Sequence, residues 1–129
     1  MKLLFQKHVS DSDINKNFQK HFPFLKLKFY NSDHPATHRL YTGQEAYRSI
    51  ITKDSIAPLP SVIEFSPSDT IEQFEQLLQK EMGLCVRVFR KIHEYWTDTR
   101  QTKHLSLHIQ NSLGAVQFHE QYNDYTLFL

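Results

Sequence analysis

Residues 66–95 constrain the fold more than any other stretch, because they read as a capped helix, a stop and a strand. Asp69 and Glu72 have the spacing of a capping box, in which two side chains satisfy free backbone amides at the start of a helix. Apolar residues then recur at helical spacing: Ile71, Phe74, Leu77, Leu78 and Met82. Gly83 is expected to end this helix, because glycine adopts the left-handed conformation at little cost.

After Gly83 the period of the sequence changes from helical to alternating. Leu84, Val86 and Val88 alternate with more polar residues, which predicts a strand over residues 84–91 with one apolar face. The apolar stripe of the helix has two interpretations, a groove for a partner or a surface packed on the chain's own sheet. We favour the second, because amphipathic helices of small domains normally cover a sheet.

A fainter copy of this design lies near the N-terminus. Residues 2–9 are predicted to form a strand, and residues 24–30 a second one after Pro23, which cannot continue a helix. Between them, apolar residues recur every four positions: Ile14, Phe18 and Phe22. Residues 2–30 and 61–91 are therefore interpreted as two related strand–helix–strand units. They reflect either an internal duplication or a common motif that occurs twice.

The segment between these units is rich in turn formers. Residues 31–38 are predicted to form a loop, residues 43–52 a short helix, and residues 54–60 an irregular connector with two prolines. Residues 61–65 are predicted to form a short strand that leads into the central helix. The connector is not predicted to separate two domains, because neither half is large enough to bury a good core alone.

The C-terminal part carries conflicting signals. Residues 92–96 are expected to return antiparallel to the preceding strand. Alternating apolar residues favour a strand over residues 104–110, whereas Ser106 as an N-cap and Gly114 as a stop would frame a short helix. A further strand is predicted over residues 115–118, and residues 125–129 form an apolar tail that should pack on this chain or on a neighbour.

Composition narrows the class of protein. The chain has 129 residues, of which 40% are hydrophobic and 22% are charged, values typical of one soluble globular domain. The two strand–helix–strand units then predict a single α+β domain with a mainly antiparallel or mixed sheet and helices on one face. The net charge of +1 argues against electrostatic capture of nucleic acid or of an anionic membrane. A single cysteine, Cys85, and the lack of an apolar leader or a membrane-length segment predict a cytoplasmic protein.

One set of residues in the second half resembles a known pattern. The set comprises Val86, Val88, Phe89, Arg90, Lys91, Trp96, Thr99, Thr102, Leu107, Gln110, Asn111 and Gly114. It is similar to an uncharacterised small bacterial α+β family with a Val-x-Val-Phe-Arg-Lys strand, a tryptophan, spaced threonines and Gln-Asn before a glycine. The resemblance implies a fold and carries no activity, and it favours a short helix over residues 106–113.

Histidines offer the main candidates for chemistry. His34 and His38, with Asp33 beside them, are the weak candidates for a metal site, although Pro35 argues against the helix that would place both imidazoles on one face. His93, His104 and His108 are further candidates. Cys85 is interpreted as a packed side chain rather than a nucleophile, because it lies within a predicted strand. No glycine-rich phosphate loop or serine elbow is visible, and no cofactor is predicted.

The leading functional hypothesis is a non-catalytic module that binds another protein or itself. It rests on the lack of catalytic motifs, an aromatic content of 13% and the apolar tail. The candidate partner-binding residues are Tyr95, Trp96, Arg90 and Arg100, because aromatic and arginine side chains are common at interfaces. A small metal-dependent or histidine-based enzyme is the alternative, and nucleic-acid binding through Lys26 and Lys28 is a weaker one.

Overall fold

The protein has an α+β fold, as the sequence predicted. The computed structural model describes residues 1–6, 10–30 and 60–127, and for residues 120–127 it describes the backbone only. The described elements are β1 (Lys2–Phe5), α1 (Asp11–His21), β2 (Leu25–Tyr30), β3 (Ser61–Glu64), α3 (Ile71–Met82), β4 (Cys85–Ile92), β5 (Tyr95–Asp98), the 3-10 helix η2 (Arg100–Thr102) and α4 (Leu107–Leu127). All described strand pairings are antiparallel, and the strands form two sheets, β1–β3 and β2–β4–β5.

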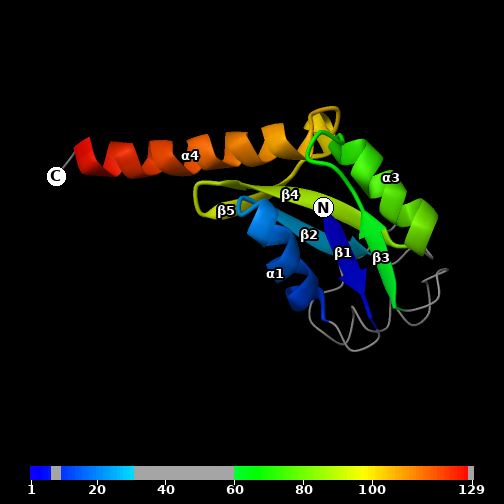
Figure 1. Ribbon diagram of the computed structural model, residues 1–129. Helices are drawn as coiled ribbons and strands as arrows, with labels where there is room; N and C mark the ends of the chain where they lie inside the picture. Colours follow the sequence, from blue (N-terminus) through cyan, green and yellow to red (C-terminus); the bar gives the residue numbers. More distant parts are fainter. Residues whose placement is uncertain (7–9, 31–59, 128–129) are drawn as a thin grey trace.

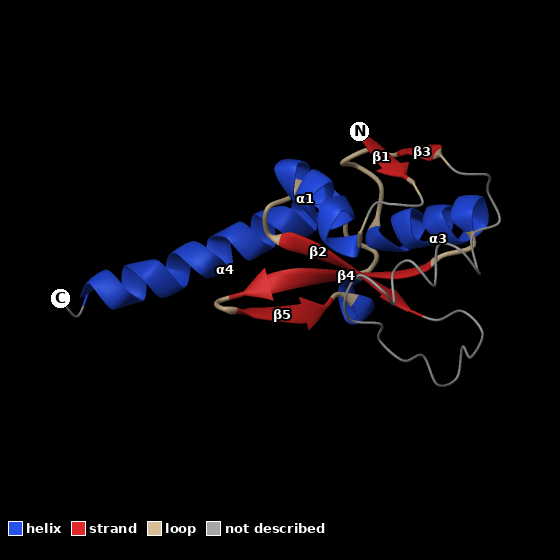
Figure 2. Ribbon diagram, turned by 90° about the horizontal axis from the view of Figure 1, so that it is seen from below, coloured by secondary structure: helices blue, strands red, loops and turns tan. Residues whose placement is uncertain are grey.

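Two strand–helix–strand units, β1–α1–β2 and β3–α3–β4, pair with each other through both of their strands. Leu3 lies opposite Ile63 in the small sheet, and Leu27 lies opposite Val88 in the large one. Figure 2 shows β1 and β3 on one side of α1 and α3, and the three-stranded sheet on the other. An internal duplication and a common motif that occurs twice remain the two interpretations of this likeness.

The core lies between these layers. Phe18 of α1 and Phe74 of α3 are fully buried, and their rings stack with centroids 5.5 Å apart. Alternate residues of β2 and of the first half of β4 face this interior, as the alternation in the sequence predicted: Leu25, Leu27, Phe29, Val86 and Val88. Burial of apolar surface on this scale is the dominant favourable term for a domain of this size.

The start of α3 differs by one residue from the prediction. The capping box is formed by Thr70 and Gln73, because the Asp69 carboxylate is occupied by the backbone N–H of Ser66 at 2.8 Å. Gly83 ends the helix with a φ of 70°, as expected. Ser10 and Asp13 form the equivalent capping box at the start of α1.

Residues 107–127 form the helix α4, so the helical alternative for residues 106–113 is confirmed over the strand, and the predicted strand over residues 115–118 is wrong. Ser106 accepts a hydrogen bond from the Ile109 N–H at 3.1 Å at the start of α4. Gly114 does not end the helix. A Cβ atom at this position would lie 2.8 Å from the Cβ of Phe24, so glycine is needed for the close approach of α4 to the chain before β2.

The N-termini of α3 and α4 satisfy each other's free amides. The N–H groups of Ile71 and Glu72 donate to carbonyls of residues 105 and 103, and those of Leu107 and His108 donate to carbonyls of residues 69 and 67, all at 2.9–3.0 Å. This reciprocal capping fixes the direction in which α4 leaves the domain. In Figure 1, α4 passes the sheet with its first turns and then extends away from the rest of the molecule.

Several predictions fall partly or wholly on residues that the structure does not describe. They are the end of the first strand (residues 7–9), the loop over 31–38, the helix over 43–52, most of the connector over 54–60, and the tail over 125–129. The predicted return after residue 92 is confirmed, although β5 begins at Tyr95 after a two-residue turn. In that turn His93 has a φ of 55°. No described helix is long and apolar enough to cross a membrane.

Candidate functional site

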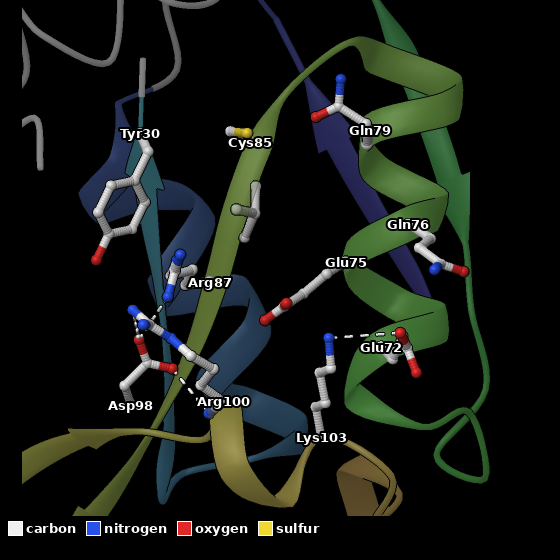
Figure 3. Close-up of a pocket in the computed structure, with 11 residues that line it drawn as sticks. Tyr30, Glu72, Glu75, Gln76, Gln79, Cys85, Arg87, Asp98, Arg100 and Lys103 are labelled. Atoms are coloured by element: carbon white, nitrogen blue, oxygen red, sulfur yellow. Dashed lines mark hydrogen bonds and ion pairs between the residues drawn. The ribbon is translucent and has the colours of Figure 1, made fainter. Parts of the chain in front are cut away.

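A cavity of about 360 Å³ lies beside β4, at the point where β5 ends. β5 pairs with β4 only from Ile92 to Phe89, so the first half of β4 has β2 on one side and the cavity on the other. The lining residues come from β2, α3, β4, β5 and the segment around η2: Tyr30, Glu72, Glu75, Gln76, Gln79, Cys85, Val86, Arg87, Asp98, Arg100 and Lys103. In Figure 3, Glu75 points from α3 toward Arg87, Asp98 and Arg100, whereas Gln76 and Gln79 point away from this group.

Glu75 is the most perturbed ionisable group in this cavity. Its Oε2 accepts a hydrogen bond from the backbone N–H of Val88 at 3.1 Å. Burial, reinforced by the charge of Asp98, raises the pKa of Glu75 to about 7, against the opposing effects of the Val88 hydrogen bond, Arg87 and Lys103. The carboxyl is therefore poised to gain or lose a proton near neutral pH.

Two arginines share one carboxylate on the sheet side of the cavity. Arg87 Nη1 lies 3.0 Å from Asp98 Oδ2, and Arg100 Nη2 lies 3.6 Å from the same oxygen. The backbone N–H of Arg100 also donates to Asp98 Oδ1 at 2.9 Å. On the α3 side, Lys103 Nζ lies 3.4 Å from Glu72 Oε1. The sheet side thus carries one more positive charge than its own carboxylate balances.

The register of the sheet directs backbone groups of β4 into the same region. Leu27 exchanges hydrogen bonds with the Asn15 side chain rather than with β4, so Leu27 and Val88 form a pair without mutual hydrogen bonds. The pair Phe29–Val86, two residues along, has the same character. The N–H and C=O of Val86 therefore point away from β2, toward the cavity that Val86 lines.

The position of Glu75 in the sequence indicates that its carboxylate faces the interior, although we did not single it out from the sequence. Glu75 is four residues after Ile71 and three before Leu78, so it lies within the apolar stripe of α3 rather than on its polar face. A carboxylate on a buried stripe is uncommon and points to a special environment. No sequence pattern indicated that Asp98 and Arg100 lie near Glu75, because their position depends on where β5 ends.

The four predicted partner-binding residues are not brought together on one surface. Tyr95 is 75% exposed at the hairpin end of β5, whereas Arg100 follows the other end of that strand and lines the cavity. Trp96 lies beneath the ammonium groups of Lys26 and Lys91. Arg90 Nη1 donates to Gln110 at 2.7 Å and so joins β4 to α4. A shared partner-binding role for these residues remains a prediction.

The predicted histidine sites are only partly described. Asp33, His34 and His38 lie outside the described residues. His104 is exposed in the turn before α4, His108 is exposed in the first turn of α4, and His93 occupies the β4–β5 turn. Among the described residues, no group of three or more histidine, cysteine, aspartate or glutamate side chains is placed to hold a metal ion. Cys85 is half-buried at the edge of the cavity.

The face of the large sheet that carries Lys26, Lys28 and Phe89 places cations over aromatic rings. Lys28 Nζ lies 4.1 Å from the ring centroid of Phe89, and Lys26 Nζ lies 5.8 Å from that of Trp96. Cation–π contacts of this kind stabilise a sheet surface. They also cover ring faces that nucleobases would need for stacking, so this face supports nucleic-acid binding only weakly.

Residues of the bacterial pattern form the joint between α4 and the sheet. Gln110 is fully buried, and its side-chain amide donates to the carbonyl and hydroxyl oxygens of Thr102, both at 2.8 Å. Asn111 accepts from the N–H of Phe24 at 2.9 Å, and the Thr99 hydroxyl donates to the carbonyl of Val88 at 2.7 Å. These contacts join α4 and the segment before it to the sheet.

Comparison of the chain with protein-family models, curated proteins and solved structures found no match. The resemblance to the bacterial family therefore remains a prediction.

A second feature is the outward face of α4. Ile109, Leu113 and Val116 are 45%, 38% and 54% exposed, and their spacing of four and three residues places them on one stripe. This outer stripe lies opposite the buried residues Leu107, Gln110 and Gly114. Residues 104–119 contain no aspartate, glutamate, lysine or arginine, in a chain that is 22% charged.

Proposed function

We propose that the protein is a self-association module in which the outer stripe of α4, residues Ile109, Leu113 and Val116, packs against the same stripe of a second copy. The observation that carries this proposal is an apolar, charge-free helix face that leaves the domain with no described element upon it. Such a face fits a two-fold interface, because the same patch must complement itself.

The spacing of the stripe suits helix pairing. Residues at i, i+4 and i+7 form the seam of antiparallel and parallel helix pairs, with about 20° between the helix axes. The 21-residue helix α4 is about 31 Å long, and the stripe from Ile109 to Val116 covers about 10 Å of it, on the side away from the buried residues. Ala115 and Ser112 beside the stripe are small and permit close approach.

The absence of charge on this part of α4 favours a second copy over a charged partner. A strongly acidic or basic partner would find no complementary charge on residues 104–119. A second copy meets no like-charge repulsion across a two-fold axis.

The test is the molar mass of the full chain in solution, measured by light scattering during size-exclusion chromatography over a range of concentrations. We expect a dimer for the wild type and a monomer for Leu113→Glu, because a carboxylate in the middle of the seam cannot be buried unpaired. The matched control is His108→Glu, which adds the same group to an exposed position of α4 about a quarter turn or more from the stripe.

A wild-type chain that is monomeric at about 100 μM would overturn the proposal. A dimer that persists in Leu113→Glu would also overturn it, because the interface would then lie elsewhere. Circular dichroism of both variants checks that the domain is folded.

A further inference from the structure

We propose that the cavity at the end of β5 binds a small zwitterionic molecule of the amino-acid or dipeptide class. Its carboxylate meets the guanidinium groups of Arg87 and Arg100, and its ammonium group meets Glu75. This site is separate from the outer stripe of α4, so the inference stands apart from the proposed function.

The positive side of the site is built from Arg87, Asp98 and Arg100. Asp98 is the only carboxylate within ion-pair distance of either guanidinium in the described part of the chain, so two positive charges face one negative charge. The Arg100 side chain is 68% exposed and has donors to spare. A planar guanidinium binds a ligand carboxylate through two parallel hydrogen bonds, which a single lysine cannot do.

The negative side is Glu75. Its Oε2 accepts from Val88, and within residues 1–6, 10–30 and 60–119 no cation lies within ion-pair distance of either oxygen. Lys103, the neighbouring cation, is paired with Glu72. Figure 3 shows Glu75 reaching from α3 toward Arg87 and Asp98, across the cavity from its own helix. A ligand ammonium group would supply the counter-charge that this carboxylate lacks.

Size and backbone geometry narrow the ligand further. A cavity of about 360 Å³ is at the small end of the range for ligand sites, about 300–1,000 Å³. The register directs both the N–H and the C=O of Val86 into this region, where they suit the donor and acceptor of one peptide group. The β4 edge does not suit a long strand, because the N–H of Leu84 donates to Leu78 and that of Val88 to Glu75.

The ionisation of Glu75 gives the binding a distinct signature. Its pKa of about 7 leaves it partly protonated at neutral pH, with Asp98 raising that pKa and Arg87 and Lys103 lowering it. A ligand ammonium group beside the carboxyl favours the ionised form, so binding releases protons. A purely anionic ligand would have the opposite effect, since it favours the protonated form and binding would take protons up.

The experiment uses the full chain and the dipeptide alanyl-alanine as the probe. Binding is followed by the NMR shifts of the Val86 and Val88 amides. Proton exchange is measured by calorimetry at pH 7 in two buffers with different ionisation enthalpies. We expect saturable shifts and proton release, and affinity reduced by about tenfold or more for the N-acetylated dipeptide and for its C-terminal amide, since each lacks one of the two charges.

Two variants locate the charges. Glu75→Gln keeps an acceptor for the Val88 N–H, so the domain should fold, and it should abolish proton release while weakening binding about tenfold. Arg100→Gln should weaken binding of the dipeptide without removing proton release. The control Glu81→Gln, an exposed position of α3 away from the cavity, should behave as the wild type. Leu113→Glu should also bind normally, which separates this site from self-association.

Three outcomes would overturn the proposal. The first is that the Val86 and Val88 amides show no shift at about 10 mM dipeptide. The dissociation constant would then exceed about 10 mM, and a specific site of this size should bind more tightly than that. The second is equal binding of the N-acetylated dipeptide with proton uptake, which would mark a site for simple anions. The third is unchanged binding in Glu75→Gln.

Discussion

The two strand–helix–strand units place a polar side chain at the same point but use it differently. Asn15 lies five residues after the N-cap of α1, and Glu75 lies five residues after the N-cap of α3. Each reaches the backbone of the strand that follows its helix, at Leu27 and at Val88, and these two residues are partners in the sheet. The tie between helix and strand therefore recurs in both halves.

The difference lies in what each side chain can satisfy. The Asn15 amide accepts from the Leu27 N–H at 2.7 Å and donates to the Leu27 carbonyl at 2.9 Å, so both edge groups are paired. The Glu75 carboxylate accepts from the Val88 N–H but cannot donate a hydrogen bond. The Val88 carbonyl instead accepts from the hydroxyl of Thr99. An amide thus pairs both the N–H and the C=O of a strand edge, whereas a carboxylate pairs only the N–H and keeps a negative charge.

The largest effect is expected for Asn15→Asp, which places a carboxylate in the first unit at the position equivalent to Glu75 in the second. We expect a loss of about 3 kcal/mol in the free energy of unfolding at pH 7, because the Leu27 carbonyl loses its donor and faces a buried carboxylate. Urea unfolding measures the effect. The loss should shrink as the pH falls, since a protonated carboxyl donates. Asn17→Asp, an exposed position on the same helix, is the control and should change stability by less than about 0.5 kcal/mol. A small, pH-independent loss would mean that the Asn15 tie is unimportant.

The converse exchange is Glu75→Gln. The pKa of Glu75 is raised from 4.5 to about 7, so the wild type loses stability as the pH rises between these values, while the variant does not. The two proteins should be equally stable at or below pH 4.5. The variant should be more stable at pH 8 by on the order of 2 kcal/mol, after allowance for solvent screening of this partly exposed group. Thermal or urea unfolding at several pH values measures this difference. A difference that does not change with pH would contradict the raised pKa, and Glu81→Gln should show none.

The smallest test compares the two capping boxes. Ser10→Ala and Thr70→Ala should each lower the free energy of unfolding by about 1 kcal/mol, because each leaves an amide of the first helical turn without its acceptor. The effect at Ser10 should be the larger, since this residue is buried and its hydroxyl also donates to Asp13 at 2.9 Å. Ser12→Ala, exposed on α1, is the control. A larger effect at Thr70 would show that the two units depend on their caps differently.

The sequence predicted those parts of the fold that depend on neighbouring residues. The apolar stripes of α1 and α3, the stop at Gly83 and the strand after it are set by local periodicity and by one backbone conformation. The prediction that Gly114 ends a helix was wrong. Glycine is needed there because α4 approaches Phe24 closely, and Phe24 lies 90 positions earlier in the chain. The position of Glu75 on the apolar stripe was a usable clue. Its grouping with Asp98 and Arg100 was not predictable, because it follows from the length of β5.

The pairing of the two units also governs how the chain reaches this structure. Both sheets join residues about 60 positions apart, at Leu3–Ile63 and at Leu27–Val88. Closing such loops is entropically costly before any contact rewards it, so the rate-limiting step should be the docking of one unit on the other rather than the formation of either helix. During synthesis the first unit is complete long before its partner strands exist. The elements of the second unit that pack on it, β3, α3 and β4, are complete only when residue 92 has left the ribosome, and we expect the chain to be most prone to aggregate before that point.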